Sequence, residues 1–260
     1  MVFFVILVEV RTYIILVYNK NMKIALIQMN SEKGNIEKNL ELTKEYFKQA
    51  IDDGAEVVVF PEMNVTGYFV SKKYLNKALT LESKEVLDIL NLTNKNNFTI
   101  IFGIAELLND KFYITQIIGE QGKIVGVYRK HNIINDETNI FTASNSKQVF
   151  YRGDLSYGIT ICADIDLPDL YEEYAKLGCN LIIECASPDL YGNREQRDWE
   201  KGYIWWRKNC VKKIGKYSKY NNVKIAVATQ RGRNEADDFP GGGYLFSENG
   251  KIINETENYK

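Results

Sequence analysis

Short apolar runs alternate with amphipathic segments along most of the chain, and this alternation is typical of a layered α/β fold. KIALIQM (23–29) and EVVVF (56–60) are apolar enough for buried strands. Between them, apolar residues recur at helical spacing over 36–50, and Gly54 ends that segment. Three further elements complete this half: a helix around 83–96, a strand over 98–106, and two strands around a Gln-Gly turn within 112–130.

The second half repeats this order of elements. Strands are predicted over 156–162, 180–184 and 223–229, helices over 169–178 and about 195–220, and a hairpin over 242–256 that turns at Glu-Asn-Gly. Two β-α-β halves with added hairpin strands predict two mixed sheets covered by helices. No low-complexity linker separates the halves, so residues 22–260 are interpreted as a single domain.

The predicted long helix carries an aromatic stripe on one side. Its members recur at helical spacing: Trp199, Tyr203, Trp206, Cys210, Ile214 and Tyr217. Such a stripe usually packs into a core or a subunit interface, and a ligand cage is the alternative.

Residues 2–18, VFFVILVEVRTYIILVY, are apolar but do not fit a membrane span. Glu9 and Arg11 divide them into runs of about eight residues, whereas a span needs about 20. The basic start and small-residue cleavage site of a signal peptide are also missing. Residues 1–21 are therefore interpreted as an N-terminal extension of open origin, or as an extra strand; a membrane anchor is the second interpretation.

Charge and cysteine content narrow the function classes. The chain has 33 Lys and Arg against 34 Asp and Glu, so it lacks the basic excess that nucleic-acid binders show. Its four cysteines, Cys162, Cys179, Cys185 and Cys210, form no CxxC pair, and His131 is the one histidine. A structural zinc site is therefore not expected. The cysteines are expected to be reduced thiols of a cytoplasmic protein.

Three chemically useful side chains follow predicted strands. Glu62 lies just past an apolar strand and a proline, where burial would raise its pKa and suit it to act as a general base. Lys130 ends a hairpin strand and can stabilise an oxyanion in a water-poor site. Cys162 ends a strand shortly before a helix, where a thiol can act as a nucleophile. Taken singly, each also has an ordinary interpretation, as a solvated loop carboxylate, a solvated base or a small buried apolar residue.

The order and spacing of these residues are more specific. FPE is followed after 68 residues by YRK, and after a further 32 by IC-x-D-x-x-x-P. This pattern resembles the nitrilase, or carbon–nitrogen hydrolase, superfamily, and specifically its amidase-like members. KIALIQM and the closing SENGKII are similar to that family too, so the resemblance runs from Met22 to the C-terminus. It implies a four-layer αββα sandwich, a homodimer or higher homo-oligomer, and neither metal nor organic cofactor.

The resemblance also implies a role for each matching residue. Glu62 matches the general base, Lys130 the lysine and Cys162 the nucleophile. Glu137, within ETNIF (137–141), matches a second glutamate that orients the lysine and the substrate amide. The N–H of Ala163 would stabilise the oxyanion together with Lys130.

Two departures from the family pattern affect the substrate. Asp166 stands where many amidase members have an arginine, so no contact with a substrate carboxylate is assumed there. Typical nitrilases have Trp-Glu after the cysteine, and this chain has Ala-Asp, which disfavours nitriles.

Two loops are expected to wall the pocket. ASPDLYG (186–192) offers Ser187 and Tyr191 for substrate binding, and RGRNEADDFPGGG (231–243) is acidic. Its charged residues, Arg231, Arg233, Asp237 and Asp238, would either select a charged substrate or form a solvated surface loop.

The expected function is cytoplasmic hydrolysis of a small linear amide or N-carbamoyl compound by water, through a cysteine thioester. An N-acyltransferase with the same residues is one alternative. A non-catalytic relative or interaction module is another, although the presence of Glu62, Lys130, Glu137 and Cys162 together argues against it. His131 is not expected to be the base, because neighbours in a strand point to opposite faces and Lys130 faces the cysteine.

Overall fold

The computed structural model describes residues 22–94, 97–190, 193–235 and 237–256, and the backbone of residues 13–19. The first sheet has the order β1-β2-β3-β4-β5-β6, with β1 (Tyr13–Asn19), β2 (Met22–Ile27), β3 (Val57–Val59), β4 (Thr99–Leu108), β5 (Lys111–Glu120) and β6 (Lys123–Arg129). The second has the order β14-β13-β10-β9-β8-β7, with β7 (Phe150–Arg152), β8 (Leu155–Ile161), β9 (Leu181–Ala186), β10 (Lys224–Thr229), β13 (Tyr244–Phe246) and β14 (Ile252–Glu255). A two-stranded sheet pairs β11 (Arg231–Asn234) with β12 (Asp237–Pro240).

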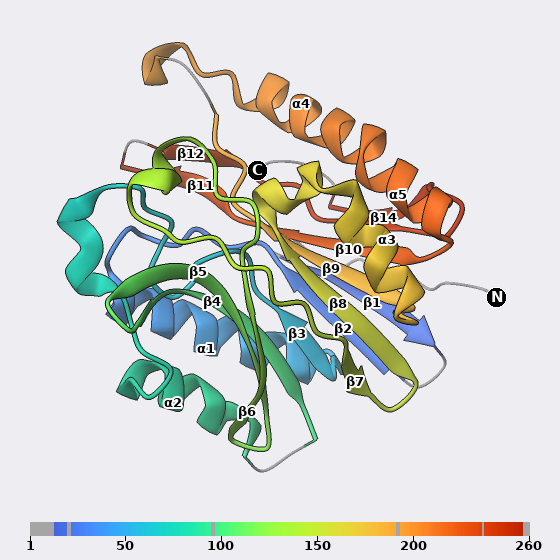
Figure 1. Ribbon diagram of the computed structural model, residues 1–260, viewed down its shortest axis with the longest axis horizontal. Helices are drawn as coiled ribbons and strands as arrows, with labels where there is room; N and C mark the ends of the chain where they lie inside the picture. Colours follow the sequence, from blue (N-terminus) through green and yellow to red (C-terminus); the bar gives the residue numbers. More distant parts are fainter. Residues whose placement is uncertain (1–12, 20–21, 95–96, 191–192, 236, 257–260) are drawn as a thin grey trace.

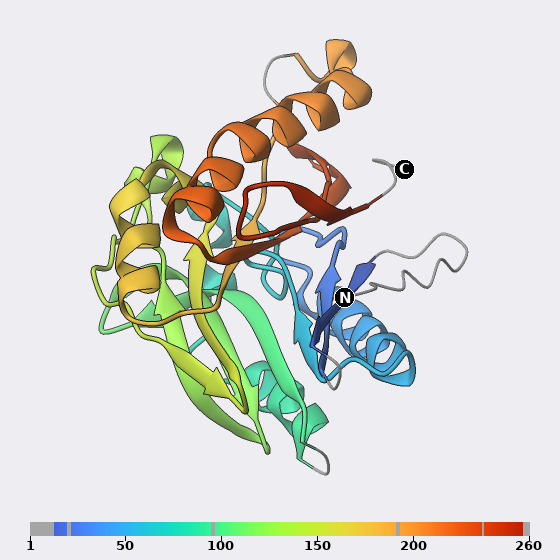
Figure 2. The same cartoon turned by 90° about the vertical axis from the view of Figure 1, so that its right-hand side faces the viewer.

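Helices cover the outer faces of both large sheets. They are α1 (Ile36–Asp52), α2 (Lys84–Leu90), α3 (Pro168–Lys176), α4 (Trp199–Lys212) and α5 (Ile214–Asn221), and 3₁₀ turns lie at η1 (Lys72–Lys77), η2 (Asn91–Thr93), η3 (Asn135–Asn139), η4 (Cys162–Asp166) and η5 (Arg194–Gln196). Figures 1 and 2 show α1 and α2 on one outer side and α3, α4 and α5 on the other. Within the described parts of the chain, every helix is too short or too polar to cross a membrane.

Three apolar cores hold these layers together. The central core lies between the sheets and includes Ile24 and Val59 from one sheet and Ile159 and Ile183 from the other. A second core joins the first sheet to α1 and α2, and a third joins the second sheet to α3, α4 and α5. Because β-strand side chains alternate between faces, each sheet contributes to two cores, which is why the strands are apolar on both sides. The predicted αββα sandwich is confirmed.

The two sheets share one strand plan. Each has three central parallel strands, β2-β3-β4 and β8-β9-β10, followed by two antiparallel strands. Each also carries an antiparallel edge strand that precedes the parallel set in sequence, β1 on β2 and β7 on β8. Within each sheet, the parallel strands have their carboxyl ends at the same edge. Residues that follow β3 in the first sheet, and β8 and β9 in the second, therefore lie at such an edge, where polar residues come together.

Part of the hydrophobic extension is a strand. Tyr13–Asn19 pairs antiparallel with β2, which agrees with the extra-strand interpretation, and residues 1–12 lie outside the described part. Its apolar composition fits both a strand and an anchor, so the sequence did not decide between them.

The predicted long helix is two helices. α4 ends at Lys212 and α5 begins at Ile214. Just after the break, Gly215 packs against Gly250 in the β13–β14 turn, where a Cβ on Gly215 would lie 2.9 Å from the Gly250 carbonyl oxygen. The buried residues keep helical spacing across the break, so the pattern could not reveal it. Trp206, Cys210 and Ile214 are buried in the third core, as the core interpretation of the stripe predicted.

The segment predicted as an acidic loop over 231–243 is mostly the β11–β12 hairpin. Its register pairs Arg231 with Pro240 and Arg233 with Asp238. The many Gly and charged residues concealed this pairing, because strands are usually recognised by apolar alternation.

Candidate active site

Glu62 lies in the turn that follows β3. Its side chain is fully buried. The backbone on either side is fixed from other strands: Gln116 on β5 donates to the Phe60 carbonyl at 3.0 Å, and Gln230, just after β10, donates to the Glu62 carbonyl at 2.9 Å. Gly103 on β4 allows this turn to approach, because a Cβ there would lie 2.4 Å from the Met63 nitrogen. Both sheets therefore position this carboxylate.

Lys130 follows β6 and is the centre of a buried charge cluster. Its Nζ lies 2.9 Å from Oε1 of Glu62 and 2.6 Å from Oε1 of Glu137, and its side chain is inaccessible to solvent. The backbone is held on both sides of the residue, by the Ile114 carbonyl and by the Ser144 N–H. An ammonium group in such a position is a fixed positive charge that needs no reorganisation when an oxyanion forms.

Glu137 lies in the turn η3 and is held by three donors. Its Oε1 accepts hydrogen bonds from Lys130 and from the Tyr68 hydroxyl, the latter at 2.9 Å, and its Oε2 accepts from the Ile134 N–H at 3.2 Å. Tyr68 was not predicted, although it ends the segment 57–68 in which Glu62 stands out. A tyrosine among loop residues gave no signal of its own.

Cys162 is the first residue after β8 and opens the turn η4. It has φ of +46°, a left-handed conformation that costs a non-glycine residue free energy and recurs at functional sites. The next residue, Ala163, is near the start of a 3₁₀ turn, where N–H groups have no partner within the turn. The other three cysteines are buried, whereas Cys162 lines a pocket.

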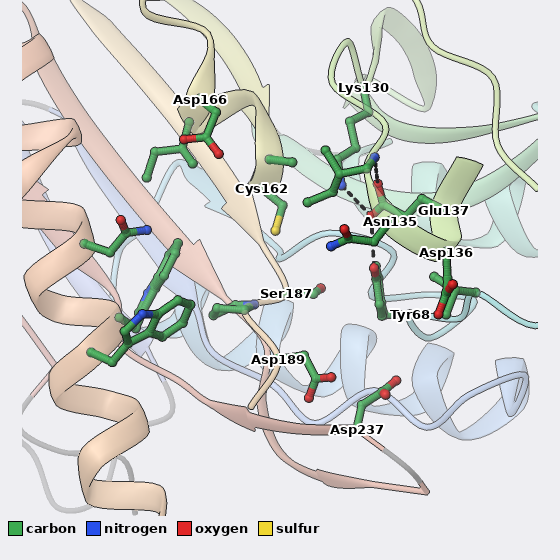
Figure 3. A pocket seen from close by; sticks show the side chains of 18 of the residues that line it. Tyr68, Lys130, Asn135, Asp136, Glu137, Cys162, Asp166, Ser187, Asp189 and Asp237 are labelled. Atoms are coloured by element: carbon green, nitrogen blue, oxygen red, sulfur yellow. Dashed lines mark hydrogen bonds and ion pairs between the residues drawn. The ribbon is translucent and has the colours of Figure 1, made fainter. Parts of the chain in front are cut away.

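The pocket has a volume of about 410 Å³, which suits a small ligand. Figure 3 shows Cys162, Lys130, Glu137 and Tyr68 together on one side, with Ser187, Asp189 and Asp237 on another. It is lined by Tyr68, Val70, Lys130, Ile134, Asn135, Asp136, Glu137, Cys162, Ala163, Ile165, Asp166, Ser187, Pro188, Asp189, Trp205, Trp206, Asn209, Lys213 and Asp237. Both segments predicted to wall the pocket thus contribute to it.

The individual contributions match the expectation only in part. Ser187 lines the pocket, and Tyr191 lies outside the described residues. Asp237 lines it, but Asp238 is fully buried and pairs with Arg194, Arg197 and Arg233 instead of facing a ligand.

Position 166, where many amidases have an arginine, does carry a pocket residue. The Asp166 carboxylate forms an ion pair with Lys213, from the junction of α4 and α5. The charge of this aspartate is therefore balanced at the pocket wall.

Burial is the largest single influence on the pKa of each candidate catalytic group. It raises the pKa of Glu62, and the positive charge of Lys130 and a hydrogen bond from the Cys162 thiol only partly offset that effect. Burial also raises the pKa of the Cys162 thiol, and the negative charge of Glu62 raises it further. For Lys130, burial alone would lower the pKa, but the nearby negative groups outweigh it and raise the pKa. The arrangement favours a neutral thiol beside a carboxylate that can take its proton, next to a permanent cation.

His131 does not join this cluster. Its Nε2 lies 3.0 Å from the Ser146 carbonyl oxygen, and its ring packs against Tyr128 with centroids 5.1 Å apart. Neither partner is a pocket residue.

Comparison with known proteins identifies the family of the chain. The profile described as carbon-nitrogen hydrolase matches residues 23–258. The chain is 26% identical over 254 residues to a glutamine-dependent NAD(+) synthetase of Acinetobacter baylyi, covering 93% of this chain and 43% of that protein. It is 27% identical over 173 residues to an (R)-stereoselective amidase of a Pseudomonas species, covering 66% and 62%. The chain thus spans less than half of the NAD(+) synthetase.

Solved structures show the same fold. The amidase from Nesterenkonia sp. superposes with a TM-score of 0.77 at 18% identity, covering 96% of this chain and 89% of that one. The glutamine-dependent NAD+ synthetase from Acinetobacter baumannii also gives 0.77, at 23% identity, covering 92% and 44%. With a family profile that extends over nearly the whole chain, the protein belongs to the carbon–nitrogen hydrolase family.

Proposed function

We propose that the protein hydrolyses the C–N bond of a small primary amide or N-carbamoyl compound through a thioester on Cys162. The observation that carries this proposal is the buried Lys130, held between Glu62 and Glu137 at the side of a pocket lined by Cys162. A nucleophile and an oxyanion donor line one small cavity, and the base Glu62 is buried beside that donor. This is the combination that acyl transfer requires.

The first half-reaction forms the thioester. Glu62 accepts the proton of the Cys162 thiol, and the thiolate attacks the amide carbonyl carbon. The carbonyl oxygen becomes an oxyanion that Lys130 and the N–H of Ala163 stabilise. The C–N bond then breaks, Glu62 returns its proton to the leaving nitrogen, and ammonia departs.

The second half-reaction releases the acid. Glu62 takes a proton from water, the resulting hydroxide attacks the thioester carbonyl, and the C–S bond breaks. The thiolate recovers the proton from Glu62, so the enzyme returns to its starting state. The same carboxylate serves both halves, which fits its position beside both the thiol and Lys130.

Ammonia release tests this proposal. We expect wild-type protein to release ammonia from at least one member of a panel of aliphatic amides, ω-amides and N-carbamoyl amines, and the Cys162→Ala variant to release none. Cys179→Ala is the matched control, because Cys179 is a buried cysteine away from the pocket. Release that persists in Cys162→Ala would contradict the proposal.

Glutamine is a second candidate substrate. The Acinetobacter baylyi relative and a Thermotoga maritima relative, 28% identical over 245 residues, are both named glutamine-dependent NAD(+) synthetase. The side-chain amide of glutamine would be cleaved by the same steps. The panel separates the candidates: a preference for glutamine over simple amides of equal length would favour this one, and the reverse would favour the first.

Acyl transfer remains an alternative outcome of the same site. If an amine acceptor intercepts the thioester faster than water, a new amide forms in place of the free acid. Acid release in water alone and amide formation with an added amine acceptor distinguish the two. A hydrolase converts the substrate to acid without any acceptor, whereas a transferase needs the acceptor for turnover.

A further inference from the structure

Asp164 lies two residues after the nucleophile and is fully buried, yet it does not line the pocket. Its carboxylate accepts four hydrogen bonds. Oδ2 accepts from the Ile161 N–H at 2.9 Å and the Tyr128 hydroxyl at 2.7 Å, and Oδ1 accepts from the N–H groups of His131 at 3.1 Å and Asn132 at 2.7 Å. The four donors are three backbone N–H groups and one hydroxyl. All are neutral, so none of these contacts is an ion pair.

The donors come from two separate parts of the fold. Ile161 ends β8 in the second sheet and directly precedes Cys162. Tyr128 lies on β6 in the first sheet, and His131 and Asn132 are the two residues that follow Lys130. One side chain therefore ties the nucleophile turn to the segment that carries the lysine.

Asn132 reinforces this link from the opposite direction. Its Nδ2 donates to the Ala163 carbonyl at 2.7 Å. The segment that follows Lys130 thus holds the Ala163 carbonyl, while the Ala163 N–H is the backbone donor proposed for the oxyanion. The strained φ of Cys162 also needs surrounding contacts to persist, and Asp164 supplies one immediately before it, at Ile161.

We infer that Asp164 is a positioning residue that sets the spacing between the two oxyanion donors, the Lys130 ammonium and the Ala163 N–H. It touches no substrate and acts through the two segments that it joins. This inference rests on the proposed function, because both half-reactions pass through the oxyanion that these donors stabilise. Oxyanion stabilisation is sensitive to donor placement of a few tenths of an ångström, because hydrogen bonds weaken steeply with poor geometry.

The Asp164→Asn variant tests the inference, because it keeps the size of the side chain but has one acceptor oxygen. Two of the four donors then face an amide NH₂ group that cannot accept from them. We expect kcat for amide hydrolysis to fall about 30-fold or more, with KM within about threefold of wild type. Asp169→Asn is the matched control, since Asp169 is exposed on α3, and it should leave kcat unchanged.

Alkylation separates positioning from general damage. Iodoacetamide attaches to Cys162 by displacing iodide, which forms no oxyanion. The alkylation rate of Cys162, followed by peptide mass, should therefore stay within about threefold of wild type in Asp164→Asn, while amide turnover is lost. Asn132→Ala, which removes the second link, should show the same split with a smaller loss, and it carries the test if Asp164→Asn does not fold.

Two results would overturn the inference. One is an Asp164→Asn variant whose kcat stays within threefold of the wild-type kcat. The other is a parallel loss of alkylation and turnover, which would assign Asp164 to the thiol or to the integrity of the pocket. Failure of the proposed function looks different, because wild-type protein would then turn over no amide at all.

Discussion

Lys130 is the positive charge that pairs with both buried carboxylates of the site. It neutralises part of the repulsion between Glu62 and Glu137, which both lie within 3 Å of its Nζ. In a buried environment a lone carboxylate is costly, and removing the partner of a buried ion pair is strongly destabilising. The positive charge of the lysine therefore favours the ionised form of Glu62 that a base requires, and in the proposed reaction the same charge stabilises the oxyanion.

The identity of the base can be tested by comparing two substitutions. We expect Glu62→Gln to lose about 10³-fold or more in kcat/KM, because it removes the base for both the thiol and the water. His131→Asn should keep at least about a tenth of wild-type kcat/KM, since its ring contacts Tyr128 and Ser146 outside the pocket. Steady-state kinetics on one good amide measure both. An inactive His131→Asn beside an active Glu62→Gln would reverse the assignment.

Tyr68 orients Glu137, and the effect is measurable. Tyr68→Phe removes the 2.9 Å hydrogen bond to a carboxylate that in turn contacts Lys130. Hydrogen bonds to charged groups contribute about 1.5–3 kcal/mol, so kcat/KM should fall at least about tenfold. Tyr220→Phe, at an exposed tyrosine, is the control and should have no effect. Equal kcat/KM for both variants would show that Glu137 is oriented without Tyr68.

At the scale of elements, the central parallel strands of the second sheet carry an unusual buried carboxyl. Glu184 on β9 is fully buried and accepts hydrogen bonds from Thr160 on β8 and from the Tyr171 hydroxyl on α3, the latter at 2.9 Å. Burial raises the pKa of Glu184 to about 8. The folded protein therefore holds a proton here that the unfolded chain releases at lower pH.

This shift makes stability depend on pH with a definite sign. Between the ordinary pKa near 4.5 and about 8, the native state binds one more proton than the unfolded state, so stability falls as pH rises. The slope reaches at most about 1.4 kcal/mol per pH unit. Glu184→Gln keeps the neutral form at every pH, so its Tm relative to wild type should rise between pH 5 and pH 8.5. Exposed Glu82→Gln is the control, and a constant difference for Glu184→Gln would contradict the assignment.

The edge strand β1 is a second test at this scale. It pairs with β2 at the far edge of the first sheet, away from β3 and β6, whose ends carry Glu62 and Lys130. A protein that begins at Met22 should be soluble and keep wild-type kcat/KM, with a lower Tm because the β2 edge loses its partner. Loss of folding would show that β1 is an indispensable strand.

At the scale of the whole molecule, the candidate catalytic groups come from both sheets. The first sheet supplies Glu62 and Lys130, and the second supplies Cys162 and the pocket residue Ser187. The links between the halves run through Gln230, which donates to the Glu62 carbonyl, and through Asp164. The site therefore exists only when both sheets are packed together, and it should be lost in one step with the global fold.

Sequence reasoning predicted the sheets and the candidate catalytic residues but not these links. Apolar strands and helical spacing predicted most elements, because burial dictates both patterns. Glu62, Lys130 and Cys162 were found through motifs with fixed spacing. Tyr68, Asp164 and Gln230 were missed as site residues, since their roles arise from contacts between segments 32 to 168 residues apart, which a local pattern does not encode.

The proposed reaction passes through a thioester on Cys162, and the mass of this thioester is its most direct test. Wild-type protein should be quenched in acid during turnover of the best amide, digested, and the peptide that contains Cys162 examined by mass spectrometry. The account predicts the acyl mass on Cys162, absent before substrate is added and absent in the Cys162→Ala variant. Turnover with no acyl mass on this peptide, or an acyl mass on Cys179, Cys185 or Cys210 instead, would contradict it.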